Sequence, residues 1–172
     1  MKILVLGSNG QLGRCLADQF SGTDYETIFT SRADIDIADL SGAKDKITKL
    51  RPDLIINASA YTAVDKAEQD RDMAYLINHE AVANIAEICA ELGCGLIHVS
   101  TDYVFDGTAT QPYKEADTTN PQGVYGDSKL QGELAIQASG CQHLIIRTAW
   151  VFSEYGNNFL KTMLRLGSER DE

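Results

Sequence analysis

The first twenty residues have the pattern of a strand, a glycine loop and a helix. Residues 2–6 form a short, mostly apolar run, which is typical of a strand buried on both faces of a parallel sheet. In the loop that follows, Gly7 allows a tight turn, Gly10 lets a pyrophosphate approach the backbone, and Gly13 allows close packing of the helix on the strand. The spacing is G-x-x-G-x-x-G instead of G-x-G-x-x-G, and such a loop can also be only a tight connection. Because it follows an N-terminal strand, we expect a nucleotide-binding site here.

Strand and helix patterns alternate along the rest of the chain. Further strands are predicted at residues 26–30, 53–57, 95–99 and 143–147. Helices are predicted at residues 41–50, 73–92, 125–136 and 158–166. This alternation predicts an α/β fold, a three-layer αβα sandwich around a doubly wound, Rossmann-like parallel sheet. A chain of 172 residues suits one domain of this kind.

Composition excludes several classes of protein. The net charge of −10 argues against binding to a nucleic-acid backbone as the main activity. No apolar run is long enough to span a membrane, and no secretory signal pattern is present. The four cysteines are scattered, without metal-ligand spacing, so we expect reduced thiols, no metal site and a cytoplasmic protein.

Tyr125 and Lys129 are the first candidate catalytic residues. They are four positions apart, so on a helix they share one face. A nearby cation lowers the pKa of a tyrosine and makes the phenol usable for proton transfer near neutral pH. Such a pair is also common on ordinary amphipathic helices, so its meaning depends on the surrounding chain.

Other polar and small residues follow the predicted strands. Thr101 and Asp102 come directly after the fourth strand, where hydroxyls can bind a carbonyl substrate or only cap the strand. The run 58–60, Ala-Ser-Ala, leaves room for a ligand after the third strand or reflects tight packing. Residues 103–123 form a long loop, which in a compact domain tends to be a lid or a binding loop. We expect His98 to be a core histidine and Asn78 to be solvent-facing or locally bonded.

The residues at the end of the second predicted strand indicate whether the cofactor is NAD or NADP. In a fold of this kind, an acidic residue here favours a free ribose 2′-hydroxyl, whereas an arginine accommodates a 2′-phosphate. Ser31 is not acidic and Arg32 follows it, which favours NADP or tolerance of both cofactors. A solvated surface arginine is an equally good interpretation of Arg32. Asp36 and Ile37 are placed to cap or flank the adenine.

Several longer runs then identify a family. The chain resembles the dTDP-4-dehydrorhamnose reductases, in the nucleotide-sugar branch of the extended short-chain dehydrogenase/reductase superfamily. The resemblance covers essentially the whole chain and is carried by residues 10–13, 51–53, 63–68, 100–107, 124–126, 147–151, 156–159 and 161–164.

The resemblance implies a reaction and a set of roles. Members reduce the 4-keto group of dTDP-4-dehydro-L-rhamnose to dTDP-L-rhamnose with NADH or NADPH. By resemblance, Tyr125 is the proton donor, Lys129 binds the nicotinamide ribose and acidifies Tyr125, and Thr101 holds the substrate carbonyl. Residues assigned to the cofactor are Gly7, Gly10, Gln11, Leu12, Gly13, Ser31, Arg32, Asp36, Ile37, Ala58, Ala60, Tyr61, Thr62, Val99, Tyr125 and Lys129. Those assigned to the sugar are Val64, Thr101, Asp102 and Trp150.

The family has a further domain after the last helix predicted here. We therefore expect residues 1–172 to be the NAD(P)-binding Rossmann domain, without the C-terminal substrate domain, and to have apolar surface that could support a homodimer. One alternative is a non-catalytic nucleotide-binding subunit resembling the regulatory beta subunit of methionine adenosyltransferase. Another is an epimerase or dehydratase of the same branch, with Asp102 as the additional acid or base.

Overall fold

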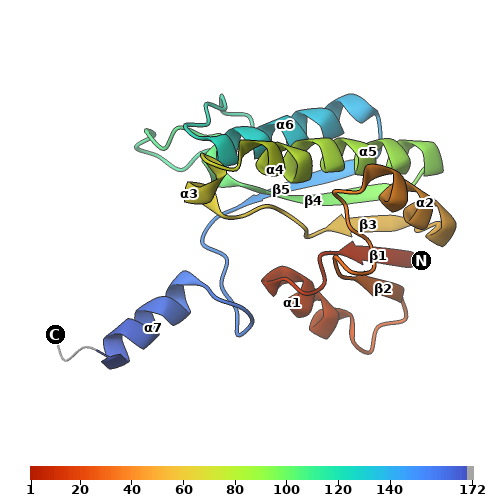
Figure 1. Ribbon diagram of the computed structural model, residues 1–172, viewed down its shortest axis with the longest axis horizontal. Helices are drawn as coiled ribbons and strands as arrows, with labels where there is room; N and C mark the ends of the chain where they lie inside the picture. Colours follow the sequence, from red (N-terminus) through yellow and green to blue (C-terminus); the bar gives the residue numbers. More distant parts are fainter. Residues whose placement is uncertain (170–172) are drawn as a thin grey trace.

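The computed structural model describes residues 1–169, which form a parallel sheet with helices on both faces (Figure 1). The strands are β1 (Lys2–Leu6), β2 (Glu26–Thr30), β3 (Leu54–Asn57), β4 (Gly95–Thr101) and β5 (His143–Thr148), and their order is β2-β1-β3-β4-β5. Because β1 lies between β2 and β3, the chain changes direction across the sheet at β1. In such sheets ligands bind beyond the carboxyl ends of the strands at this position.

The helices complete the predicted three layers. Figure 1 shows α2, α5 and α6 on one face of the sheet and α1 on the other. The helices are α1 (Gln11–Phe20), α2 (Leu40–Leu50), α3 (Val64–Ala67), α4 (Arg71–Tyr75), α5 (Ala81–Leu92), α6 (Val124–Ser139) and α7 (Phe159–Glu169), with a π-helical turn η1 (Leu76–Glu80) and a 3₁₀ turn η2 (Asp102–Val104). The predicted αβα sandwich is confirmed.

The sheet separates two clusters of buried apolar side chains. Leu4, Leu6 and Ile55 face the layer that contains Ile47 of α2 and Ile85 of α5. On the opposite face, Ile3, Val5 and Ile56 pack with Leu16 and Phe20 of α1. Central strands that are apolar on both sides therefore fix the layers, as the sequence predicted.

The predicted helix at residues 73–92 differs from what is observed. It begins at Arg71 and contains η1, in which Asn78 is only 1% exposed. The Asn78 side chain bonds the backbone of Tyr61, and a side chain on Gly132 of α6 would collide with the Asn78 carbonyl. A local widening of the helix thus accompanies contacts that come from distant parts of the chain.

The long loop before α6 is held by its own side chains. The rings of Phe105 and Tyr113 stack with centroids 4.2 Å apart. Asp106 accepts hydrogen bonds from Thr108, Tyr113 and Asn120, and these bonds, with the Thr108 backbone N–H first, hold the pKa of its carboxyl below the usual value. The loop is therefore a packed wall and not an open connection.

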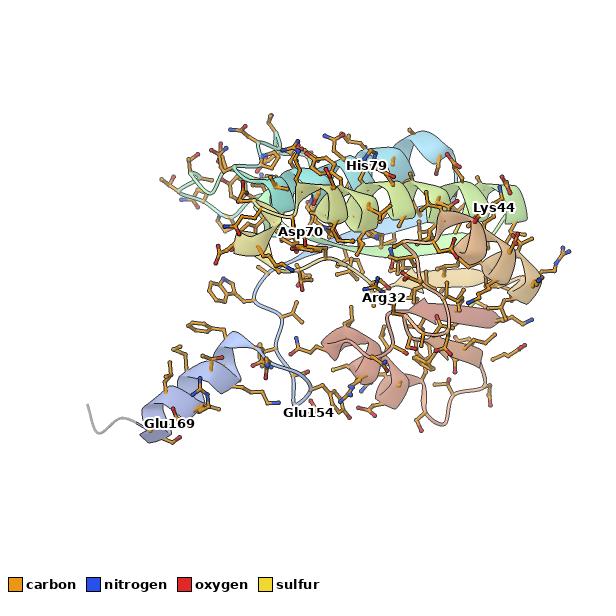
Figure 2. The ribbon with its side chains drawn as sticks, in the orientation of Figure 1. Arg32, Lys44, Asp70, His79, Glu154 and Glu169 are labelled. Carbon is orange, nitrogen blue, oxygen red and sulfur yellow. The ribbon has the colours of Figure 1, made fainter. Side chains whose placement is uncertain are left out.

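The segment between β5 and α7 passes beside α1. Figure 2 shows Glu154 in this segment, next to α1, and Glu169 at the far end of α7. Gln11 of α1 bonds the carbonyl of Val151 at 3.1 Å and the amide of Asn158 at 2.8 Å. Among residues 1–169, no helix is long and apolar enough to cross a membrane, and no group of three potential metal ligands was found.

β5, α7 and the segment between them present apolar side chains to solvent. They include Leu144, Ile146, Trp150, Phe152, Phe159 and Leu164, each more than two-fifths exposed. This agrees with the expectation of uncovered apolar surface, whereas the homodimer stays a prediction.

Candidate active site

A cavity of about 600 Å³ opens at the carboxyl end of β4, between the long loop and the start of α6. It is lined by Val64, Glu68, Asp102, Tyr103, Phe105, Asp106, Gly107, Tyr113, Gln122, Gly123, Tyr125, Gly126 and Trp150. The cavity therefore brings together Tyr125 and three of the four residues assigned to the sugar, from four separate segments of the chain.

Tyr125 enters the cavity wall because of how α6 begins. Glu68 caps the helix by accepting a hydrogen bond from the backbone N–H of Val124 at 2.8 Å. A side chain on Gly126 would collide with the carbonyl of Tyr103. Because glycine has none, α6 packs directly on η2. The rings of Tyr103 and Tyr125 then meet edge to face, with centroids 5.6 Å apart. Sequence reasoning gave no role to Glu68 or Tyr103, although both lie in runs that carry the family resemblance, because their partners are distant in the chain.

Thr101 lies at the end of β4 beside Tyr125. Its hydroxyl donates to Asp102 at 3.1 Å and accepts from the backbone N–H of Tyr103 at 3.2 Å. Burial raises the pKa of Tyr125, and a hydrogen bond with Thr101 opposes that rise only in part. The phenol is therefore protonated at neutral pH and has a proton to give.

Lys129 lies one turn further along α6 and is only 1% exposed. Its Nζ donates to the carbonyl of Val99 at 2.7 Å and lies 3.3 Å from Nε2 of His98. Burial lowers the pKa of Lys129 to about 8, against a smaller opposing effect of Glu133. The sequence led us to expect that Lys129 lowers the pKa of Tyr125. The structure differs: the pKa of Tyr125 is raised, because burial outweighs the other influences and the Lys129 amine is bonded to β4.

The glycine loop has the geometry that a phosphate requires. Gly7 has φ +84°, and a side chain on it would collide with Ala58 and Ser59 after β3. A side chain on Gly13 would strike the Gly7 carbonyl. No side chain caps the start of α1 at Gly10, and its first turn has no acidic residue. The first N–H groups of α1 are thus available to an anion, which fits the pyrophosphate of a dinucleotide.

The residues assigned to the adenosine end of the cofactor differ in their exposure and in their partners. Arg32 forms an ion pair with Asp36 at 3.1 Å and remains largely exposed, close to the glycine loop (Figure 2). Ser31 bonds Asp34 through its hydroxyl at 2.7 Å. Ile37 is only 7% exposed and its side chain packs in the core, so the predicted place of Asp36 and Ile37 beside the adenine would involve the backbone at Ile37 and stays a prediction. In this stretch Ile35 and Ile37 are buried, whereas Asp34 is exposed and Asp36 is half-buried.

The residues after β3 connect the cofactor side to α6. Tyr61 donates its backbone N–H to Asn78 Oδ1 at 2.9 Å and accepts from Asn78 Nδ2 at 3.0 Å. Asn78 also bonds the hydroxyl of Ser128, the neighbour of Lys129, at 3.1 Å. The expectation that Asn78 faces solvent or bonds locally is therefore wrong. Ala58, Ala60, Tyr61 and Val99 are half-buried, and Thr62 is exposed.

Trp150 follows β5 and is 74% exposed. Its backbone has φ +53°, which is unusual for a residue with a side chain. The indole packs edge to face on Phe159, with ring centroids 5.0 Å apart, and lines the cavity. An exposed flat ring in this place suits the apolar face of a sugar.

Known proteins are similar to this chain in both sequence and structure. A dTDP-4-dehydrorhamnose reductase of Sinorhizobium fredii is 45% identical over 172 residues, which is all of this chain and 58% of that protein. The crystal structure of a dTDP-4-dehydrorhamnose reductase of Clostridium acetobutylicum matches 99% of the chain with a TM-score of 0.96 and 43% identity, over 61% of its own length. One from Bacillus anthracis, in complex with NADP, matches 98% with a TM-score of 0.95 and 38% identity, over 60% of its length.

The chain thus spans about three-fifths of the length of these relatives, in both comparisons. The model of one protein family, the RmlD substrate binding domain, matches residues 1–172. Since this match runs through the glycine loop, the Thr101–Asp102 turn and the start of α6, it includes every segment that builds the cavity. The chain belongs to the RmlD substrate binding domain family.

Proposed function

We propose that this chain is the cofactor-binding part of a dTDP-4-dehydrorhamnose reductase, which reduces the 4-keto group of dTDP-4-dehydro-L-rhamnose to dTDP-L-rhamnose. The observation that carries the proposal is that Thr101 and Tyr125 meet beside one cavity while Lys129 follows on the next turn of α6. Thr101 lies 24 positions before Tyr125 in the chain, and only the fold brings it beside α6.

Each residue has a separate task in this reaction. A bound nicotinamide cofactor would supply the hydride. The Thr101 hydroxyl, which donates to Asp102 in the free chain, would turn to the substrate carbonyl. Tyr125 donates its proton to the oxygen as negative charge develops there. Lys129 binds the nicotinamide ribose, and the N-terminus of α1 holds the pyrophosphate. Asp102, Val64 and Trp150 contact the sugar.

Either NADPH or NADH suits the site, and Arg32 is the residue that would distinguish them. The relative from Bacillus anthracis was solved with NADP. We expect Arg32→Ala to weaken NADPH binding by about 10-fold or more, because a charge-assisted hydrogen bond to the 2′-phosphate is lost, and to leave NADH binding unchanged. Fluorescence titration with both cofactors measures this. Arg165→Ala, on α7, is the matched control and should change neither affinity. Equal effects of Arg32→Ala on both cofactors would exclude a role for Arg32 in cofactor choice.

The test of the function is oxidation of NADPH by the full-length protein. We expect absorbance loss that requires dTDP-4-dehydro-L-rhamnose and yields dTDP-L-rhamnose. A non-catalytic binding subunit would instead bind the cofactor without turnover and capture a partner enzyme in a pull-down. A homodimer is a further prediction, to be checked by light scattering.

A further inference from the structure

Lys129 has a buried neighbour that the proposed reaction does not use. Nζ of Lys129 lies 3.3 Å from Nε2 of His98, and Nδ1 of the same ring lies 3.2 Å from Nδ2 of Asn57. None of the three side chains is more than 1% exposed. They form a line from β3 through β4 to α6 that is closed to solvent. The position of each proton is therefore determined by the hydrogen-bond partners of these side chains.

The protons along this line can be assigned from the hydrogen bonds. Oδ1 of Asn57 accepts from the backbone N–H of Ser59 at 3.0 Å, which orients the amide so that its NH₂ group faces His98. An NH₂ group donates, so Nδ1 of His98 must be the unprotonated acceptor. The neutral ring then carries its single proton on Nε2, directed at Lys129. Burial, with the charge of Lys129 as a lesser cause, lowers the pKa of His98 well below its usual value, so the ring is neutral.

An ammonium group fits this arrangement poorly. A protonated lysine has three donors and no acceptor, so it would place an N–H against the Nε2–H of His98. A neutral amine fits, because it can donate to the Val99 carbonyl at 2.7 Å and accept from Nε2–H with its lone pair. Glu133, on the same helix, is the other charged group that acts on Lys129, and it is paired with Arg147 of β5.

We propose that His98, held in one tautomer by Asn57, is a positioning residue that favours the amine form of Lys129. The inference rests on the proposed function only in that Lys129 belongs to the proposed site. A lysine that binds its proton weakly exchanges it near neutral pH. Neither His98 nor Asn57 would be expected to touch substrate.

The wild-type protein provides the first test, by nuclear magnetic resonance. The ¹⁵N shifts of the imidazoles report which ring nitrogen carries the proton, and the His98 signals are those lost in His98→Gln. We expect His98 to be protonated on Nε2 from pH 6 to pH 9. Protonation on Nδ1 would overturn the proposal without any need for a variant to fold.

Asn57→Asp tests the consequence for Lys129. An aspartate accepts from Nδ1–H, which would leave Nε2 as an acceptor for an ammonium group. We expect the titration midpoint of Lys129, followed by the ¹³C shifts of labelled lysine, to rise by at least about one pH unit, a tenfold gain in proton affinity. Asn84→Asp is the matched control, since Asn84 bonds Leu40 at 2.9 Å, away from this line, and should leave the midpoint unchanged.

Two results of that titration would contradict the proposal. One is an unchanged midpoint in Asn57→Asp. The other is a raised midpoint with His98 still protonated on Nε2, since the new charge alone would then be the cause. These spectra require no turnover, so an inactive wild-type protein would refute the proposed reductase function and leave this inference to be judged separately.

Discussion

Tyr125→Phe is expected to abolish reduction of the keto sugar while cofactor affinity stays near normal. Only the phenolic oxygen is removed, and the ring that packs against Tyr103 is kept. Because burial raises the pKa of Tyr125, the wild-type phenol holds its proton until the substrate oxygen takes it. Loss of a positioned general acid lowers the rate by about 10²–10⁴-fold.

Turnover of NADPH and a cofactor titration, both on the full-length variant, measure these two effects. Tyr25→Phe is the matched control, because Tyr25 packs against Phe20 at the other end of the sheet and should leave the rate unchanged. A Tyr125→Phe enzyme with a wild-type rate would rule out Tyr125 as the proton donor. A rate loss that is matched by loss of cofactor binding would show that the phenol acts in binding instead.

Arg147→Met is expected to give the largest loss of stability. Arg147 binds both carboxylate oxygens of Glu133, at 2.6 to 3.2 Å, and Glu133 is completely buried. Arg147 also donates to the carbonyl of Glu115 at 3.3 Å and lies over the ring of Phe105 at 4.9 Å. It therefore joins β5, α6 and the long loop. Leaving a buried carboxylate without its partner costs about 3–5 kcal/mol.

Urea unfolding followed by circular dichroism measures this free energy. Arg165→Met removes a pair in which both side chains are more than half exposed, and it should cost less than about 1 kcal/mol. The double variant Arg147→Met/Glu133→Leu should recover most of the loss, since no buried charge remains. Equal effects of Arg147→Met and Arg165→Met would contradict the account of a buried, shared anchor.

The sequence was sufficient for features determined by neighbours in the chain. The glycine loop, the apolar strands and the Tyr125–Lys129 spacing depend on local geometry, and the structure places all three where the pattern indicated. The partners of Asn78, His98 and Glu68 could not be assigned in this way, although His98 is the core histidine that the sequence predicted. Their partners are Tyr61 and Ser128, Lys129, and Val124, at separations of 17 to 56 residues. Such contacts depend on how helices pack and not on spacing.

Lys129 shows most clearly where inference from spacing fails. A lysine four residues after a tyrosine suggests a cation that acidifies the phenol. The structure buries that lysine against β4 and gives it a carbonyl and an imidazole as partners, so burial dominates both pKa values. Residue identity gives the chemical groups that are available, whereas their protonation depends on surroundings that come from other strands.

The most direct test of the central claim is to trace the hydride. The full-length protein would be incubated with dTDP-4-dehydro-L-rhamnose and NADPH that carries deuterium at the transferable position of the nicotinamide. We predict dTDP-L-rhamnose with deuterium at C4, seen by mass spectrometry and by loss of the C4 proton signal. Cofactor that binds but keeps its deuterium, or deuterium found elsewhere on the sugar, would contradict the assignment of this chain to a 4-keto sugar reductase.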